Sequence, residues 1–144
     1  RYFEGAVPEP GDPGDAEQPV LSAAEDLRTS APEAMAECRF HVYLDKILGL
    51  TGATNVYIDR TEPFKLAKDP SQRERLGTIL YTCAEAVRII LMYLAPVMPT
   101  AAPAGLDQLG WKRGDSPLEE SGRWGVLPPG TKTVKGEALF PRKQ

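Results

Sequence analysis

The chain has 144 residues, 42% of them hydrophobic, which suits one domain with one packed core and excludes an intrinsically disordered protein. Its net charge of −3 is unevenly distributed: residues 1–37 carry nine acidic and two basic side chains, and residues 38–144 carry the other eleven acidic and fifteen basic ones. The net charges of the two parts are thus −7 and +4. Neither part shows the strongly basic stripe of a free-standing DNA-binding domain, so we expect no DNA partner.

The N-terminal segment and the longest apolar run indicate in which cellular compartment the protein is expected. The chain does not open with a basic segment followed by an apolar run, so we expect no signal peptide. The longest apolar run, IILMYLAPVM, is about half the length that a membrane span needs, and it contains a proline. We therefore expect a cytoplasmic protein without a membrane partner.

The cysteines and the single histidine offer few metal ligands. Cys38 and His41 are three residues apart, but a structural zinc site needs four ligands and Cys83 would supply only a third. The two cysteines form no CxxC pair and suit a reducing compartment. We expect both to be small buried side chains on helices, and we expect no metal site.

The first nineteen residues read as a connector. RYF resembles the end of a helix whose beginning is missing, so we expect a fragment of a larger protein. The stretch AVPEPGDPGDAEQP, residues 6–19, is acidic and holds four prolines and two glycines without apolar periodicity. The sequence thus predicts a connector over residues 1–19, a helical bundle over 20–110 and an irregular tail over 111–144.

Two helices are predicted in the first part of the bundle. One begins at Pro19 or Val20 and ends at Arg28, and a second begins near Pro32. Glycines within the second helix, in the segment GLTG, predict the close approach of another backbone. Its apolar stripe has alternating spacings of four and three residues and consists of Phe40, Leu44, Ile47, Thr51, Thr54 and Ile58.

The third helix has the clearest signals. Asp69 is a good N-cap, Pro70 suits the first helical position, and Gln72 stands where a capping box places its amide. We expect Leu80 and Val87 to be buried. The whole predicted core stripe consists of Leu76, Leu80, Cys83, Val87, Ile90, Leu91 and Leu94.

A shorter helix and a tail follow. Thr100 is a candidate cap for a helix that ends at Leu109, and the residues after it are rich in glycine and proline. Only short extended segments such as 132–134 are possible there. Trp111 and Trp124 are expected to anchor the tail against the bundle or against another domain of the protein. The predicted fold is all-α, an antiparallel bundle of about four helices with an irregular C-terminal tail.

Catalytic patterns are not visible. The glycines of GLTG lie inside a helical pattern, so they do not form a phosphate-binding loop. One histidine and scattered serines provide no pair of nucleophile and base, and Glu119 and Glu120 lie in a polar loop. We expect no catalytic residue in this chain.

Four segments together resemble a known family. They are RYFEGAVPEPG, NVYIDRTEPFKLAKD, RIILMYLAPVMPTAA and EALFP, and in this order they are similar to the anticodon-binding region of methionyl-tRNA synthetase over residues 1 to about 141. The resemblance implies the helical anticodon-binding domain of a class I aminoacyl-tRNA synthetase. It also implies two partners: the anticodon of tRNA(Met), and the enzyme's own Rossmann-type catalytic domain upstream of residue 1.

The resemblance places the chemistry outside this chain. In the family the HIGH-like and KMSKS-like motifs that bind ATP with Mg, and any zinc, belong to the catalytic part. Neither motif occurs in this sequence. The resemblance therefore implies no cofactor in this chain.

The resemblance also implies an anticodon-binding site. In the family the helix that carries N-x-Y-I ends at a proline followed by an aromatic residue, usually tryptophan, that stacks on a base of the CAU anticodon. Phenylalanine at this position keeps a stacking face but lacks the indole N–H. The family's other anticodon readers, an asparagine and an arginine, would lie upstream of residue 1. The expected tRNA-binding residues are Phe64, Pro63, Asn55, Arg60, Lys65 and Lys68.

Each of these residues has a structural alternative. In these alternatives Phe64 packs inward at the helix junction, and Asn55 bonds locally or organises the loop. The lysines are then only solvated. At the level of function, one alternative is a helical protein-protein interaction module whose partner docks on residues 63–68. Another is the anticodon domain of a leucine, isoleucine or valine synthetase.

Overall fold

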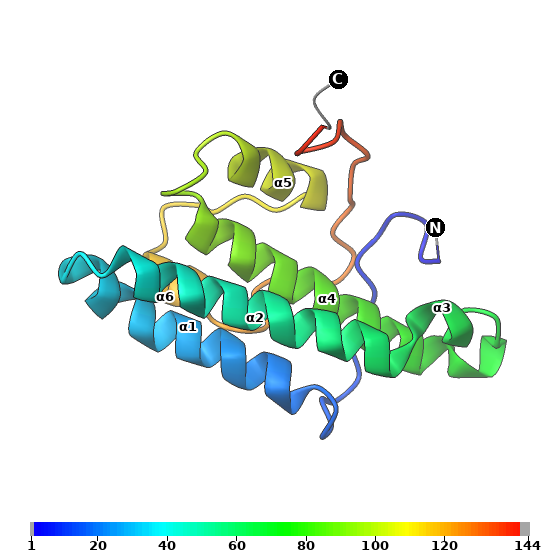
Figure 1. The fold of residues 1–144 in the computed structure, drawn as a ribbon. Helices are drawn as coiled ribbons and strands as arrows, with labels where there is room; N and C mark the ends of the chain where they lie inside the picture. Colours follow the sequence, from blue (N-terminus) through cyan, green and yellow to red (C-terminus); the bar gives the residue numbers. More distant parts are fainter. Residues whose placement is uncertain (1, 142–144) are drawn as a thin grey trace.

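The computed structural model describes residues 2–141, which fold as a bundle of helices (Figure 1). In this part of the chain there is no β-sheet, and a single antiparallel bridge joins Ala6 to Lys132. The predicted all-α fold is confirmed. The helices are α1 (Gln18–Ala36), α2 (Phe40–Thr61), α3 (Pro63–Leu66), α4 (Arg73–Leu94), α5 (Ala101–Leu109) and α6 (Leu118–Ser121), with a 3₁₀ turn over Pro70–Gln72 before α4.

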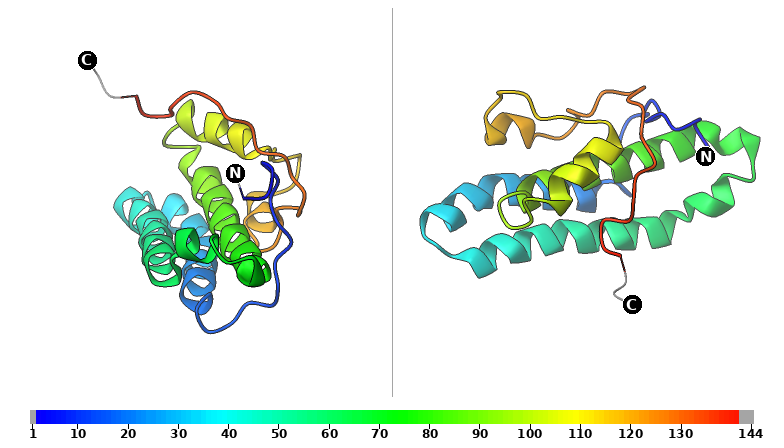
Figure 2. Two further views of the ribbon diagram at one scale, coloured as in Figure 1. Left: turned by 90° about the vertical axis from the view of Figure 1, so that its right-hand side faces the viewer. Right: turned by 90° about the horizontal axis from the view of Figure 1, so that it is seen from above.

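The long helix α4 lies at the centre of the molecule. Viewed end-on, α2 lies on one side of it, α1 below it and α5 above it (Figure 2, left). The segments before α1 and after α5 run along the side of α4 that faces away from α2. They pair through the Val7 N–H bond to the carbonyl of Thr131, at 2.9 Å, and the Gly130 N–H bond to the carbonyl of Val7, at 2.7 Å.

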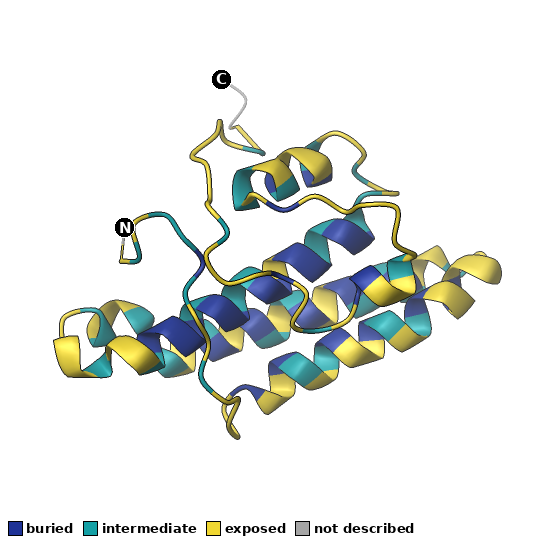
Figure 3. Ribbon diagram, turned by 180° about the vertical axis from the view of Figure 1, so that it is seen from behind, coloured by how far each residue is buried: buried dark blue, intermediate teal, exposed yellow. Residues whose placement is uncertain are grey.

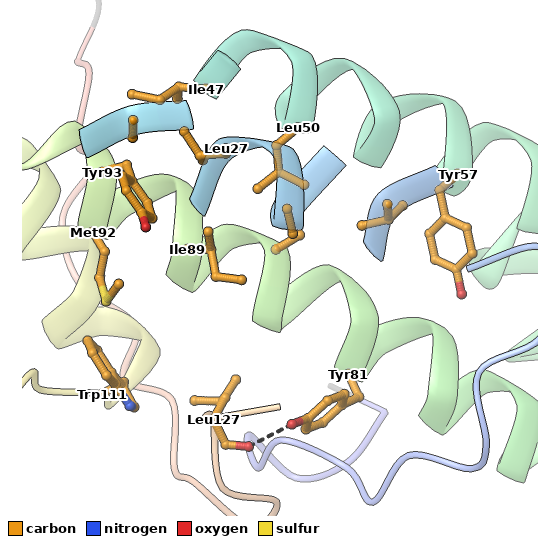
Figure 4. Packing of buried hydrophobic residues seen from close by; sticks show 14 of the residues in the cluster. Leu27, Ile47, Leu50, Tyr57, Tyr81, Ile89, Met92, Tyr93, Trp111 and Leu127 are labelled. Atoms are coloured by element: carbon orange, nitrogen blue, oxygen red, sulfur yellow. Dashed lines mark hydrogen bonds between the residues drawn. The ribbon is translucent and has the colours of Figure 1, made fainter. Parts of the chain in front are cut away.

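The core lies where α1, α2 and α4 meet (Figure 4). Leu27 from α1, Ile47 and Leu50 from α2, and Ile89 and Tyr93 from α4 are all buried there. Burying side chains of this size contributes roughly 1.5 to 3 kcal/mol each, so packing between helices outweighs local helix preferences.

The break between α1 and α2 lies later than the sequence predicts. α1 continues through Pro32 to Ala36, and the chain turns at Cys38, whose φ is 55°. The predicted helix end at Arg28 and helix start near Pro32 are therefore wrong. The reason is that the buried face of α1 continues on both sides of Pro32, so packing against α2 compensates the hydrogen bond that proline cannot make. That face consists of Val20, Ala24, Leu27, Ala31 and Ala34.

The buried face of α2 is rotated from the predicted stripe. Ile47 and Thr54 are buried as predicted, but Phe40 is 56% exposed. A Cβ atom added at Gly49 or Gly52 would meet nothing within 4 Å, so the predicted close approach of another backbone is also wrong. The buried residues of α2 are Tyr43, Ile47, Leu50, Thr54 and Tyr57.

A 3₁₀ turn begins where the third helix is predicted, but α4 itself begins three residues later, at Arg73, with Gln72 as its N-cap and no side-chain cap bond. The buried face of α4 also differs from the prediction. The Asp69 carboxylate accepts the Ser71 N–H at 2.9 Å and caps the 3₁₀ turn that leads into α4. Leu80 is only half-buried and Val87 is 41% exposed, so their predicted burial is wrong. The tail covers a different face of α4, one that carries the charged residues Glu85 and Arg88.

Arg88 holds the tail against α4. Its guanidinium pairs with Glu85, donates to the carbonyls of Ser121 at 2.6 Å and Arg123 at 2.9 Å, and lies 4.8 Å from the centre of the Trp111 ring. Both charged side chains are fully buried. Charged groups are tolerated at such depth only when they are paired and hydrogen-bonded, which is the case here.

Glu85 and Tyr81 complete this attachment of the tail. The carboxylate of Glu85 accepts the N–H groups of Val126 at 2.9 Å and Leu127 at 3.2 Å. The hydroxyl of Tyr81 donates to the carbonyl of Leu127 at 2.9 Å (Figure 4). Trp124 is half-buried against the same core. The tail is thus irregular in backbone but packed, and the predicted anchoring by its tryptophans is confirmed.

One helix is long and apolar enough to span a membrane by length and composition alone. It comprises the 3₁₀ turn and α4, Pro70–Leu94, and its most apolar window has a mean hydropathy of 1.4. Of that window 67% is buried inside the bundle. Its apolar composition is accounted for by its position at the centre of the core.

Candidate nucleic-acid interface

The candidate site begins where α2 ends. Glu62 adopts a left-handed conformation, with φ 44° and ψ 55°, between Thr61 at the end of α2 and Pro63 at the start of α3. Proline disfavours the helical conformation in the residue before it and offers no N–H to continue the helix. The sequence therefore ends α2 at this point, and the chain turns away into a new direction.

Phe64 points into solvent. Its side chain is 54% exposed, and no residue of α3 is buried (Figure 3). Pro63 is half-buried, while Lys65 and Lys68 are exposed. The alternative that Phe64 packs inward at the junction is wrong. The ring is therefore accessible to a partner from solvent.

The charges around Phe64 are mixed, and residues 58–74 carry four basic and four acidic side chains. Lys65 pairs with Glu62 at 2.6 Å, but both side chains are largely exposed, and such pairs stabilise a protein by roughly 0 to 1 kcal/mol. Arg60 and Lys68 are exposed, and neither makes an ion pair with another described residue. Both cations are therefore accessible to an anionic partner.

Asn55 is exposed on the outer face of α2, two turns before the helix ends. Its side chain makes no hydrogen bond to any residue within the described range. The alternative that it organises the loop around Phe64 is therefore wrong. Its amide remains accessible from solvent.

Arg60 also borders a cavity on another side of α2. The cavity has a volume of about 550 Å³ and lies between the beginning of α1 and the second half of α2. Its walls include Pro19, Val56 and Tyr57, and Phe64 is not among its lining residues. The structure thus places the expected site residues along one end of the molecule but does not gather them in one pocket.

The segment around Phe64 has no buried residue, and Leu66 packs against the core from a partly buried position. We call residues 58–74 the arm, and none of them is buried. Tyr57, directly before the arm, is 3% exposed, and Arg75 directly follows it. The arm projects beyond the body of the bundle at one end of the molecule (Figure 1).

A buried carboxylate connects the two ends of the arm. Glu17, which is 1% exposed, accepts the Tyr57 hydroxyl at 2.5 Å and pairs with Arg75 at 2.7 Å. The Gly14 N–H donates to its other oxygen at 2.8 Å. Sequence reasoning missed this cluster, because its members are far apart in the chain and none belongs to a recognisable motif. Tyr57 itself is buried in the core.

The electrostatics of this cluster favour a charged Glu17. Burial acts to raise the pKa of Glu17, but hydrogen bonds from Arg75, Tyr57 and the Gly14 N–H outweigh burial and hold the pKa below its ordinary value of 4.5. Burial and the neighbouring carboxylate raise the pKa of Tyr57 well above its usual range, so its hydroxyl stays protonated and donates.

The residues considered for a metal site lie apart. Within residues 2–141 no group of three or more His, Cys, Asp and Glu side chains could hold a metal ion. Cys38 and His41 are exposed, and Cys83 is half-buried. The expectation that both cysteines are buried helical residues is therefore wrong for Cys38, which lies in the turn between α1 and α2.

Comparison with known proteins identifies the relatives of this chain. No family model matches the sequence. The sequence is 38% identical over 142 residues to a methionine–tRNA ligase of Caldanaerobacter subterraneus and 33% identical over 144 residues to one of Deinococcus radiodurans. The chain is a homologue of one region of methionyl-tRNA synthetases.

The solved structures agree with this assignment. Mycobacterium tuberculosis methionyl-tRNA synthetase in complex with methionyl-adenylate matches 99% of the chain with a TM-score of 0.89 and 31% identity. The free form of the same synthetase matches 100% of the chain with the same TM-score and identity. The chain spans about a fifth of the length of the curated synthetases, 22% and 21% for the two named above. It thus matches one domain-sized part of these synthetases.

Proposed function

We propose that this chain is the anticodon-recognition module of a methionine–tRNA ligase, and that it binds tRNA(Met) without catalysing a reaction itself. The observation that carries the proposal is the solvent-exposed Phe64 directly after Pro63, at the end of the helix with the N-x-Y-I motif, in a homologue of methionyl-tRNA synthetases. An exposed aromatic ring beside accessible cations suits stacking on an unpaired base.

Each site residue has a role in this proposal. Phe64 stacks on an anticodon base, and Pro63 directs the chain so that the ring faces solvent. Asn55 offers an unengaged amide to a base edge, while Arg60 and Lys68 attract the phosphate backbone. Lys65 joins them once phosphate competes with Glu62 for its ammonium group. The recognition surface belongs to the bundle of residues 20–110, between the connector 1–19 and the tail 111–144.

The rest of the reaction belongs to another part of the enzyme. In this proposal a catalytic domain elsewhere in the parent protein joins methionine to tRNA for protein biosynthesis in the cytoplasm, using ATP with Mg and any zinc that it binds. The chain itself supplies affinity for the anticodon. Purified alone, it should show no methionine-dependent exchange between ATP and pyrophosphate, and detecting that exchange would overturn the division of labour.

The alternatives have less support. The relatives named above are methionine–tRNA ligases, which favours methionine over leucine, isoleucine or valine as the amino acid of the parent enzyme. A protein-protein interaction module would present a wider apolar surface than one phenylalanine flanked by lysines. The observed arm fits RNA better than a protein partner.

Titration with tRNA transcripts tests the proposal. The protein is titrated with a tRNA(Met) transcript that carries the anticodon CAU and with one whose anticodon alone is changed. We expect the CAU transcript to bind more tightly, and we expect both affinities to fall as salt is added because phosphate contacts release counterions. Equal affinity for the two transcripts would contradict anticodon recognition.

A further inference from the structure

The arm that carries Phe64 has no core of its own. None of residues 58–74 is buried, and Leu66 is the one hydrophobic side chain among them that packs, partly buried, against the core. Segments with few buried contacts open and reorient at low free-energy cost. The direction in which Phe64 points therefore depends on how the two ends of the arm are held.

Glu17 holds both ends of the arm. Tyr57 on α2 directly precedes the arm and donates its hydroxyl to Glu17, and Arg75 on α4 directly follows the arm and pairs with the same oxygen. Gly14 fixes the other oxygen from the side of the connector. Because the carboxylate is 1% exposed, water does not replace these partners without the cluster opening.

We propose that Glu17, acting through Tyr57 and Arg75, is the positioning residue that orients Phe64 for tRNA. The inference rests on the proposed function and adds to it a determinant at the N-cap of α1, outside the surface that touches RNA. When the cluster is intact, the end of α2 and the start of α4 keep one spacing, and the ring is presented in one direction. When the cluster is broken, the arm samples other directions and binding must select the productive one, which lowers affinity.

A double-mutant cycle separates positioning from general stability. Affinity for tRNA(Met) is measured for the protein, for Tyr57→Phe, for Phe64→Ala and for the double variant. Tyr57→Phe should weaken binding about three- to tenfold when Phe64 is present and less than about twofold when it is absent, since contacting or networked residues are energetically coupled. Glu17→Gln should show the same coupling to Phe64.

A matched control is available on the same helix. Tyr43 is also buried on α2, and its hydroxyl donates to the carbonyl of Tyr93 at 2.5 Å, at the far end of the bundle from the arm. Tyr43→Phe removes one buried hydroxyl bond, as Tyr57→Phe does, and its effect on thermal unfolding should be similar. It should leave tRNA affinity unchanged.

The outcomes distinguish the two proposals. If Phe64→Ala alone leaves tRNA affinity unchanged, the proposed stacking fails, and the positioning role fails with it. If Phe64→Ala weakens binding but Tyr57→Phe weakens it equally with and without Phe64, only the positioning role is wrong. Coupling of both Tyr57→Phe and Glu17→Gln to Phe64, with Tyr43→Phe silent, supports the inference.

Discussion

The attachment of the tail to α4 and the arm around Phe64 are held in opposite ways. At the tail, Arg88 and Glu85 are fully buried, and their polar atoms bond to each other and to the tail backbone. In the arm no residue is buried, and Phe64 is 54% exposed. The side chains at the tail are therefore constrained by folding, whereas those of the arm are available for binding.

The largest expected effect is at the tail. Arg88→Met should lower the free energy of unfolding by about 3 to 5 kcal/mol, because it leaves the Glu85 carboxylate buried without its partner. Denaturant titration measures this loss. Arg28→Met is the control, because Arg28 pairs with Glu25 at the surface and should contribute about 0.5 kcal/mol or less. Similar losses in the two variants would remove the contrast between tail and surface.

An intermediate effect is expected at Glu17, and it depends on pH. The pKa of Glu17 is held below its ordinary value of 4.5 in the folded protein, so below that pH the unfolded chain binds more protons. The stability that Glu17 contributes is present above pH 4.5 and is lost as pH falls towards the folded-state pKa. Urea titrations from pH about 6 to about 3.5 should therefore show a stability difference between the protein and Glu17→Gln that narrows with acidification. A difference that stays constant would mean that Glu17 does not titrate as described.

A smaller effect, of opposite sign, is expected on the exposed face of α2. Gly49 has nothing within 4 Å of the place where a Cβ would stand. Gly49→Ala should therefore raise the free energy of unfolding by about 0.5 to 1 kcal/mol, since alanine loses less conformational freedom in a helix. Gly105→Ala is the matched contrast, because its Cβ would stand 2.9 Å from a methyl group of Leu91 and should destabilise the protein. A destabilising Gly49→Ala would indicate that this face of α2 is covered.

The sequence predicted correctly the features of the fold that local capping and proline signals determine. Asp69 and Pro70 fix the start of the 3₁₀ turn that leads into α4 through capping and proline geometry. The end of α2 before Pro63 followed from the family resemblance. The end of α1 was missed because the left-handed turn at Cys38 and the tolerance of Pro32 both depend on packing against α2. No local pattern in the sequence indicates either feature.

The remaining wrong or missing predictions concern residues whose contact partners are far away in the chain. Leu80 and Val87 were placed in the core because hydrophobic spacing alone cannot show that a distant tail will bury Glu85 and Arg88 instead. The cluster of Glu17, Tyr57 and Arg75 was missed for the same reason. The assignment of Phe64 to the binding site followed from the family resemblance. The solvent exposure of its ring is visible only in the structure.

The most direct test measures two quantities on one variant, Phe64→Ala. Because the ring is exposed, the free energy of unfolding should change by less than about 0.5 kcal/mol. Affinity for tRNA(Met) should fall by roughly 1 to 3 kcal/mol, the worth of one base stacked on an aromatic ring, and Phe64→Trp should keep or improve it. The preference for the CAU anticodon over a changed one should fall with it. A sharply lowered melting temperature together with an unchanged ratio of affinities for the two tRNAs would contradict the stacking role of Phe64.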